Sequence, residues 1–442
     1  MPLRKILLAV TVAVLIVGAG CFAVAWRAAI DPVRRPAPAS FDPALVKRGG
    51  ELAAIGNCHT CHTAPGGRDF AGGLGVPTPF GTIYSTNITP DDATGIGTWS
   101  EEAFRRALHE GVDRGGRHLY PAFPYDHFTL LSDEDVKALY AFVMTREPVA
   151  ARAPDNTVPF PLNLRPLLAG WKLLFLRAGR YQPDPNQNVE WNRGAYLANG
   201  LAHCGACHTP RNALGAETRD HFAGGEAEGW TAYALNAASP APVPWDAAAL
   251  SFYLHNGWHR SHGVARGPMS DVTDNLSTVP IADVRAIATY VASIATPASD
   301  ERRAKGAPVD DAHAASPGAA IYLAACASCH DGSRPPPYGG IDLAHSTGPS
   351  GPNARNVINV IMWGLPALDM EARPVMPGFA ATLSDRQLAD LLAYVRARFS
   401  DKPPWTEVDK HIREARGGQP RVYPGPAPPP ARGAPGQQEA RQ

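Results

Sequence analysis

The sequence predicts a mainly α-helical protein in which three related domains follow one another along the chain. Two observations predict this fold class. The pattern Cys-x-x-Cys-His occurs three times, at residues 58–62, 204–208 and 326–330. Each copy follows a segment with helical spacing and precedes a long loop rich in Gly and Pro, which ends in a second helical segment. A third observation, an uncharged run near the amino terminus, adds a membrane helix to this fold.

The repeated motif is typical of covalent attachment of c-type haem. Two thiols three positions apart lie on one side of a helical turn, where they can add to the two vinyl groups of one haem. The adjacent histidine then offers a ring nitrogen to the iron. The three motifs contain six of the seven cysteines, so we expect three covalently bound haem c groups. The expected attachment residues are Cys58, Cys61, Cys204, Cys207, Cys326 and Cys329, with His62, His208 and His330 as iron ligands.

Other chemistries of paired cysteines fit this pattern poorly. A structural zinc site needs four clustered ligands, whereas these pairs lie more than a hundred residues apart. A thioredoxin-like Cys-x-x-Cys needs a βαβ setting, which the sequence does not predict. Structural disulfides would not explain why a histidine follows every pair.

Composition narrows the class of protein further. A length of 442 residues predicts several domains, and the formal net charge of zero gives no reason to expect a nucleic-acid partner. Only 19% of the residues are charged, while the chain has 42 glycines and 44 prolines. Such a chain is rich in loops, which a haem domain tolerates because the cofactor supplies much of its core.

The amino-terminal segment 1–30 contains the uncharged run, from Ile6 to Trp26. As a helix this run would be roughly 31 Å long, enough to cross a bilayer. Its length favours a retained membrane anchor, and the alternative is a signal peptide cleaved after Ala25. Because haem is attached to such motifs outside the bacterial cytoplasm, we expect the protein at the cytoplasmic membrane, on its periplasmic face.

The three expected domains share a plan. Their closing helices have the same apolar spacing, and each has an aromatic residue at the penultimate position, Phe142, Tyr290 or Tyr394. Within the first linker, residues 164–176 are apolar but too short to span a membrane, so they either lie in an interface or pack across two domains. The expected boundaries are domain one at 41–147, a linker at 148–189, domain two at 190–296, a linker at 297–314, domain three at 315–400, and a proline-rich, disordered tail at 401–442.

The positions of two methionines predict the sixth ligands of two of the irons. Met269 and Met376 each lie twelve residues after a glycine that ends the preceding expected helix, in loops that contain proline. Methionine is a common second axial ligand of c-type haem, so both are predicted to bind iron. The same offset in the first domain falls on Phe123, which cannot bind iron.

The first iron therefore needs a different sixth ligand. We favour His127, four residues after Phe123 in the same expected loop. Met144 is the second choice, because it lies in the closing helix, and an open or water-bound site is the third. His118 precedes the loop, and its neighbours suit a surface turn or a contact with a haem propionate better than a bond to iron.

The motifs, together with residues 119–125, 267–269 and 375–377, resemble the tri-haem cytochrome c subunits of bacterial membrane-bound dehydrogenases. Those subunits serve alcohol, gluconate and aldehyde dehydrogenases, and the resemblance covers roughly residues 41–400. In the alcohol-type members the Phe123 position is typically methionine. Phenylalanine there, with residues 126–128 and 239–245, looks closer to cytochromes that accompany molybdopterin hydroxylases, which oxidise aldehydes or N-heterocycles.

The resemblance implies a non-catalytic electron-transfer subunit. A separate dehydrogenase subunit, of the molybdopterin type and with an iron–sulfur subunit as an optional further partner, would oxidise the substrate. This chain would relay electrons over three haems to ubiquinone or a terminal oxidase. No nucleotide-binding glycine motif or serine elbow is evident. The alternative is a multihaem peroxidase, which needs an open sixth position such as Phe123 would leave at the first iron.

Overall fold

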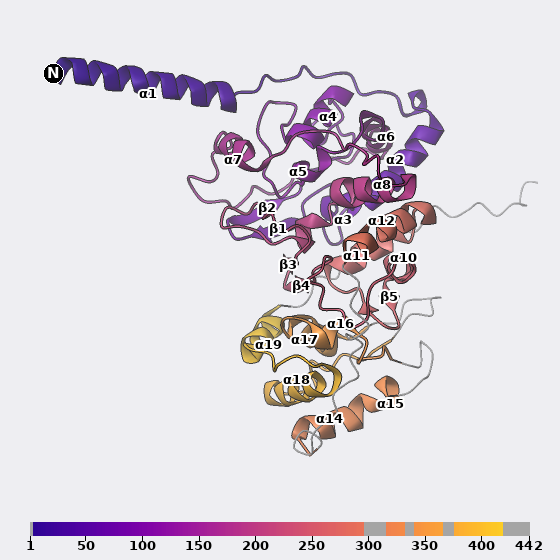
Figure 1. Cartoon of the computed structure of the whole chain (residues 1–442). Helices are drawn as coiled ribbons and strands as arrows, with labels where there is room; N and C mark the ends of the chain where they lie inside the picture. Colours follow the sequence, from indigo (N-terminus) through magenta and orange to yellow (C-terminus); the bar gives the residue numbers. More distant parts are fainter. Residues whose placement is uncertain (1–2, 296–314, 332–339, 366–374, 419–442) are drawn as a thin grey trace, which may run out of the picture.

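The computed structural model describes residues 3–295, 315–331, 340–365 and 375–418. This part of the chain is mainly helical, as predicted, with three small two-stranded antiparallel sheets. Helix α1 (Leu3–Ala25) projects from the body of the molecule (Figure 1). Among the described residues it alone is long and apolar enough to cross a membrane, a test that a signal sequence also passes.

The first motif lies in a region of helices with one short hairpin. Ser100 and Ser132 cap two of these helices, each through its side chain, and acidic residues follow both caps. Strands β1 and β2 pair from Gly75 with Tyr84 to Thr78 with Gly81. The elements are η1 (Pro38–Ser40), α2 (Pro43–Ile55), α3 (Cys58–His62), β1 (Gly75–Thr78), β2 (Gly81–Tyr84), α4 (Glu101–Glu110), α5 (Tyr125–Phe128) and α6 (Asp133–Met144).

The second motif region repeats this order after a linker that packs on the first region. In the linker, the Thr157 backbone N–H donates to the carbonyl oxygen of Thr82 in β2 over 3.0 Å. The elements are α7 (Leu167–Phe175) in the linker, then α8 (Val189–Tyr196), the π-helix η2 (Leu197–Leu201), α9 (Gly205–His208), β3 (Gly225–Ala227), β4 (Trp230–Ala232), α10 (Ala247–Asn256), β5 (Trp258–His259), β6 (Gly263–Val264), α11 (Pro268–Leu276) and α12 (Ile281–Ile294).

The third motif region includes part of the predicted tail. Residues 401–418 were expected to be disordered, but Ile412 and Ala415 are buried on one face of α19, and Trp405 donates its indole N–H to the Gly351 carbonyl oxygen. The amphipathic pattern of residues 408–417 therefore forms a packed helix, although the tail as a whole is rich in proline. The predicted linker 297–314 and residues 419–442 lie outside the described residues. The elements are α14 (Pro317–Ala325), α15 (Ala327–His330), α16 (Thr347–Ser350), α17 (Arg355–Trp363), α18 (Asp385–Phe399) and α19 (Val408–Gly417).

In every region the opening helix crosses the closing helix at a glycine. A β-carbon on Gly49 of α2, Gly194 of α8 or Gly318 of α14 would overlap a backbone carbonyl of the closing helix. The aromatic residue four positions after each of these carbonyls, Phe142, Tyr290 or Tyr394, packs over the glycine. The crossing is therefore a backbone-to-backbone contact that only glycine permits.

The π-helix η2 explains a difference in spacing between the first two regions. Ten positions separate the crossing glycine Gly194 from Cys204, whereas nine separate Gly49 from Cys58. A π turn takes up one extra residue without breaking the helix. Leu197 to Leu201 form this turn, so the second motif keeps the same relation to its helix crossing.

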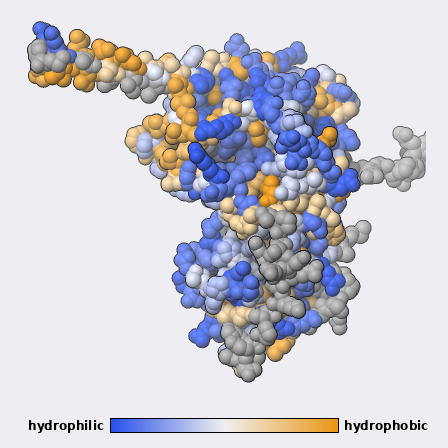
Figure 2. All heavy atoms as spheres, in the orientation of Figure 1, coloured by the Kyte–Doolittle hydropathy of each residue, from blue (hydrophilic) through white to orange (hydrophobic). Residues whose placement is uncertain are grey.

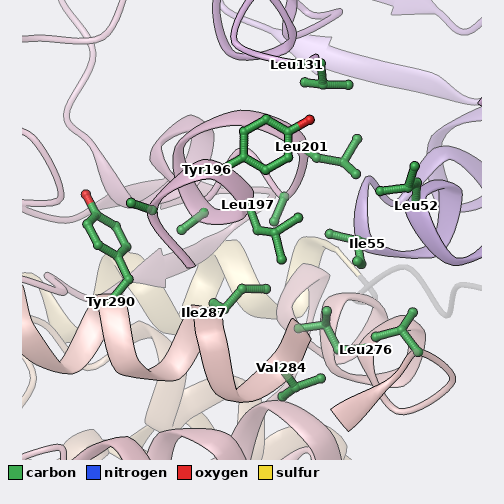
Figure 3. Close-up of a cluster of buried hydrophobic side chains, with 14 of the residues drawn as sticks. Leu52, Ile55, Leu131, Tyr196, Leu197, Leu201, Leu276, Val284, Ile287 and Tyr290 are labelled. Atoms are coloured by element: carbon green, nitrogen blue, oxygen red, sulfur yellow. The ribbon is translucent and has the colours of Figure 1, made fainter. Parts of the chain in front are cut away.

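The first and second regions share one core, and the third region has its own. Figure 3 shows Leu52 and Ile55 of α2 facing Leu197 and Leu201 of η2, with Ile287 of α12 below them. Each of these side chains is at most 2% exposed. Burying such a side chain stabilises the fold by about 2 kcal/mol, so the shared core holds the first two motifs in a fixed relation.

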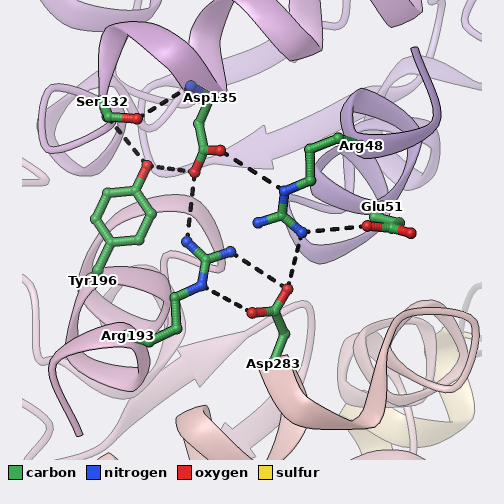
Figure 4. A network of polar contacts seen from close by, with 7 residues as sticks. All are labelled: Arg48, Glu51, Ser132, Asp135, Arg193, Tyr196 and Asp283. Carbon is green, nitrogen blue, oxygen red and sulfur yellow. Dashed lines mark hydrogen bonds and ion pairs between the residues drawn. The ribbon is translucent and has the colours of Figure 1, made fainter. Parts of the chain in front are cut away.

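A charged network crosses the same boundary (Figure 4). Asp283 of α12 accepts from Arg193 of α8 at 2.8 Å and from Arg48 of α2 at 3.1 Å. Asp135 of α6 accepts from the hydroxyl of Tyr196 at 2.8 Å and lies 3.6 Å from the guanidinium of Arg193. Two carboxylates thus bridge two guanidinium groups from both regions.

We expect this network to weaken in acid. Burial alone raises the pKa of Asp283, but hydrogen bonds and charge from Arg193 and Arg48 outweigh it, so the folded pKa lies below the ordinary 3.8. Such a group stabilises the folded state fully at pH values above its pKa in the unfolded chain. This contribution disappears as the pH falls through its pKa in the folded protein. Asp283→Asn should cost about 3 kcal/mol at pH 7 and less at pH 3.

Thermal unfolding at both pH values tests this expectation. Asp220→Asn, which alters an exposed carboxylate of the second region, is the matched control and should leave the unfolding temperature unchanged at both. If Asp283→Asn lowered the unfolding temperature equally at pH 7 and pH 3, the carboxylate charge would not be the stabilising feature.

Candidate haem-attachment sites

The three motifs form short helical turns that present their cysteines together. The first lies on α3, and the second and third begin one residue before α9 and α15. All six cysteines are free thiols in the structure. Burial raises the pKa of Cys58 and of Cys204 to about 12, so these thiols are uncharged at neutral pH. Zinc binding and thiol exchange both use thiolate, which this environment disfavours.

The motif histidines are all oriented by the same contact. The Nδ1 atom of His62 donates to the Thr86 carbonyl oxygen over 2.6 Å, and His208 makes the same bond to Tyr233. His330 bonds Ile341 in this way at 2.9 Å. A proton held on Nδ1 leaves the Nε2 lone pair for a metal, which is the usual arrangement of a ligating histidine.

The electrostatics of two of these rings favour the same role. Burial lowers the pKa of His62 and of His208, against a smaller raising effect of the bonded carbonyl. Both rings are therefore neutral at pH 7 and keep the lone pair that an iron ligand needs. Paired neutral thiols beside an oriented, neutral imidazole fit covalently attached haem.

Sequence reasoning missed the residue that follows each motif. Thr63 and Thr209 accept a hydrogen bond at 3.1 Å from the backbone N–H of Phe70 and Phe222, respectively, which fixes the loop after the motif. In the third region Asp331 takes this position and accepts from Tyr322 at 2.6 Å. The signal was the threonine that follows both of the first two motifs.

The turns around the predicted sixth ligands match between the first two regions. Gly111 and Gly257 end α4 and α10 with positive φ, and each carbonyl oxygen accepts from the backbone eight residues later. Met269 and Phe123 each lie four residues beyond that bond and pack against the shared core. Phe123 therefore takes the place in the first region that Met269 takes in the second.

The third region resembles this arrangement less closely. Gly364 also ends its helix with positive φ, but Met376 pairs directly with Leu365 through two backbone hydrogen bonds of 2.8 and 3.0 Å. Met376 is partly buried against the third core. Residues 366–374 between the paired positions lie outside the described residues.

His127 lies away from the place that the sequence predicted. Its Nδ1 bonds the Asn199 carbonyl oxygen and its Nε2 bonds the Glu217 carboxylate, both at 2.7 Å. A β-carbon on Gly205 would come within 3.0 Å of both His127 and Glu217, so the pair lies against the second motif.

These contacts place His127 beside the second motif, and its assignment to the first iron stays a prediction. Burial alone lowers the pKa of His127, but the Glu217 hydrogen bond and the Asp126 charge outweigh it and raise that pKa. Both ring nitrogens are bonded to oxygen atoms, an arrangement that suits a protonated ring. The offset from Phe123 could not reveal this, because Glu217 and Asn199 come from the second region.

The other two candidates for the first iron are also engaged. Met144 is fully buried and packs with Ile96, Tyr140 and Val143. His118 was expected in a surface turn or at a haem propionate but is only 3% exposed, and both of its ring nitrogens have partners.

These features define the class of protein as a c-type cytochrome. The family model of cytochrome c matches residues 46–147, and the model described as cytochrome c oxidase, cbb3-type, subunit III matches residues 313–395. The chain belongs to the cytochrome c subunits of membrane-bound dehydrogenases.

Three relatives place it in that family. The chain is 36% identical to the fructose dehydrogenase cytochrome subunit of Gluconobacter japonicus, over 88% of this chain and 86% of that protein. It is 37% identical to the gluconate 2-dehydrogenase cytochrome c subunit of Pantoea cypripedii, over 84% of this chain and 90% of that protein. It is 46% identical to a nicotinate dehydrogenase subunit of Pseudomonas putida, over 89% of this chain but only 34% of that protein. The chain thus spans about a third of this last relative.

The comparisons confirm the predicted family and its electron-transfer role. Cytochrome c domains carry covalently bound haem c, and the relatives named here are subunits of dehydrogenase complexes. A catalytic dehydrogenase partner follows from that membership. The alternative of a peroxidase is not favoured.

Proposed function

We propose that this chain holds three haem c groups in tandem domains at 41–147, 190–296 and 315–400. The observation that carries the proposal is the Nδ1 contact with a backbone carbonyl, which recurs at His62, His208 and His330. The adjacent cysteine pairs would attach the haems, and Met269 and Met376 would be sixth ligands. Phe123 would leave the first iron without a methionine.

The proposed role is an electron relay. Each haem, when bound, supplies a centre that accepts and donates one electron, while the protein sets its potential through ligands and burial. The shared core and the charged network between the first and second regions support this role, because they fix the distance between two attachment sites. A fixed distance keeps electron transfer between the two sites reproducible.

We infer that the electron donor is a molybdopterin-type dehydrogenase that oxidises an aldehyde or an N-heterocycle. The relative with 46% identity is named for nicotinate, which is an N-heterocycle. The acceptor would be ubiquinone or a terminal oxidase, and an iron–sulfur subunit would lie between the catalytic centre and this chain. Helix α1 would anchor the chain in the cytoplasmic membrane, with its body in the periplasm.

Purification of the native complex tests the donor. The chain should be isolated from solubilised membranes with its partner, and the complex analysed for molybdenum, flavin and pyrroloquinoline quinone. We expect molybdenum, and reduction of the haems when an N-heterocycle such as nicotinate or an aldehyde is added. Flavin or pyrroloquinoline quinone without molybdenum would instead assign the chain to a sugar-, gluconate- or alcohol-oxidising complex.

A further inference from the structure

Helix α7 in the linker buries its charged residue and exposes several of its leucines. Its only charged residue, Lys172, is buried at 9% exposure, while Leu167, Leu173 and Leu174 are 53–67% exposed. A helix on the surface of a soluble protein shows the opposite arrangement. The exposed apolar side chains continue into the preceding loop, and together they form what we call the α7 face: Phe160, Leu162, Leu164, Leu167, Leu173 and Leu174.

Lys172 explains why the leucines face outwards. Its ammonium donates to the carbonyl oxygens of Glu110 and Gly111, both over 2.6 Å, and to Nδ1 of His118 over 3.0 Å. The first two partners lie at the carboxyl end of α4, where the helix dipole favours a cation. Because a buried amine without hydrogen-bond partners would be costly, these bonds fix the rotation of α7 about its axis.

The α7 face lies beside the end of the apolar helix α1. His118, which accepts from Lys172, also donates its Nε2 proton to the carbonyl oxygen of Ala25, the last residue of α1, over 2.8 Å. Arg165 donates to the backbone carbonyl of the same histidine over 2.9 Å. Figure 1 shows α7 on the side of the body from which α1 projects, and Figure 2 shows apolar surface at the base of α1.

The chemistry of this surface suits phospholipid. Nine residues are too few to span a bilayer, so α7 can only lie along its surface. The exposed side chains of Arg27 and Arg177, which follow the ends of α1 and α7, are suited to anionic headgroups. A large exposed apolar patch is otherwise rare on a monomeric soluble protein.

We propose that the α7 face lies in the headgroup layer of the membrane that α1 crosses. The inference depends on the proposed anchoring by α1, because the shared contacts of His118 place both elements at one level. The first region is then held against the bilayer.

Site-directed spin labelling of the full chain in anionic phospholipid vesicles tests the proposal. After haem attachment the motif cysteines are blocked, so Cys21→Ala with Leu174→Cys leaves one free thiol. Leu323→Cys in the third region is the matched control, because Leu323 is 61% exposed and Leu174 is 59% exposed. We expect a water-soluble nickel complex to reach the label at 174 several-fold less than the label at 323, and oxygen to show the reverse preference.

Two results would overturn the proposal, and they distinguish a failure of the lipid contact alone from a failure of the anchoring by α1. Equal access of nickel to both labels, in protein that sediments with the vesicles, would show that α1 anchors the chain while the α7 face contacts something other than lipid, such as a protein partner. Protein that stays in the supernatant would overturn the anchoring by α1 and the lipid contact together. Haem absorbance unchanged from the wild type confirms that the labelled variants are folded.

Discussion

A Gly194→Ala variant is expected to be strongly destabilised, although it adds a single methyl group. The new β-carbon would overlap the carbonyl oxygen of Ala286 and crowd the β-carbon of Tyr290, and neither atom can move away without separating α8 from α12. Overpacking of this kind costs about 3 kcal/mol. Because the first and second regions share a core, the unfolding temperature of both should fall by roughly 6–12 °C.

Gly170→Ala is the control for that variant. Gly170 lies inside α7, and no atom outside its own chain neighbourhood lies within 4 Å of its β-carbon position. The same substitution there should stabilise the protein by roughly 0.5–1 kcal/mol, since alanine is the better helix former. Thermal unfolding followed by far-ultraviolet circular dichroism in detergent compares the two. A Gly194→Ala protein as stable as the wild type would mean that the two helices cross less closely than described.

Replacing either proposed methionine ligand should change one haem and leave the others intact. Met269→Leu and Met376→Leu nearly conserve side-chain volume, so they remove the sulfur with little effect on packing. Each should lower the potential of its haem by on the order of 0.1–0.3 V, within the roughly 0.8 V range that axial ligands control. Since about 59 mV corresponds to a tenfold change for one electron, the altered haem would become a barrier in the relay.

The sulfur-to-iron band of the oxidised protein gives a direct reading of the same claim. If Met269 and Met376 are the only methionine ligands, each single variant should lose half of the band and the double variant all of it. Met362→Leu is the control, because Met362 is buried at 2% exposure in the third core and should leave the band unchanged. A band that survives in the double variant would mean that another methionine, such as Met144, binds iron.

Local pattern was sufficient to predict much of the fold. The cap at Ser132, the capping box of Ser384 with Gln387, and the glycines that end α4, α10 and α17 all follow from residue preferences that act within one or two turns. The aromatic residues of the closing helices were recognised from spacing alone. The glycines opposite them were not, because a close approach of two backbones leaves no periodic signal.

What sequence reasoning missed depends on contacts between distant segments. His127 was assigned to the first iron from a loop offset, yet its partners Asn199 and Glu217 belong to the second region. The linker helix α7 left two interpretations open because its composition does not reveal which face is buried. The contacts of Lys172 with α4 and His118 show which face is buried, and they join residues more than fifty positions apart.

The central claim is that one chain carries three covalent haems, and intact-protein mass spectrometry tests it most directly. Non-covalent haem should first be removed by acid extraction, so that only thioether-linked haem remains. The account predicts a mass that exceeds that of the apoprotein by three haem masses, and by two in a variant with Cys204 and Cys207 replaced by alanine. An excess of two haem masses or fewer in the unaltered protein would contradict it.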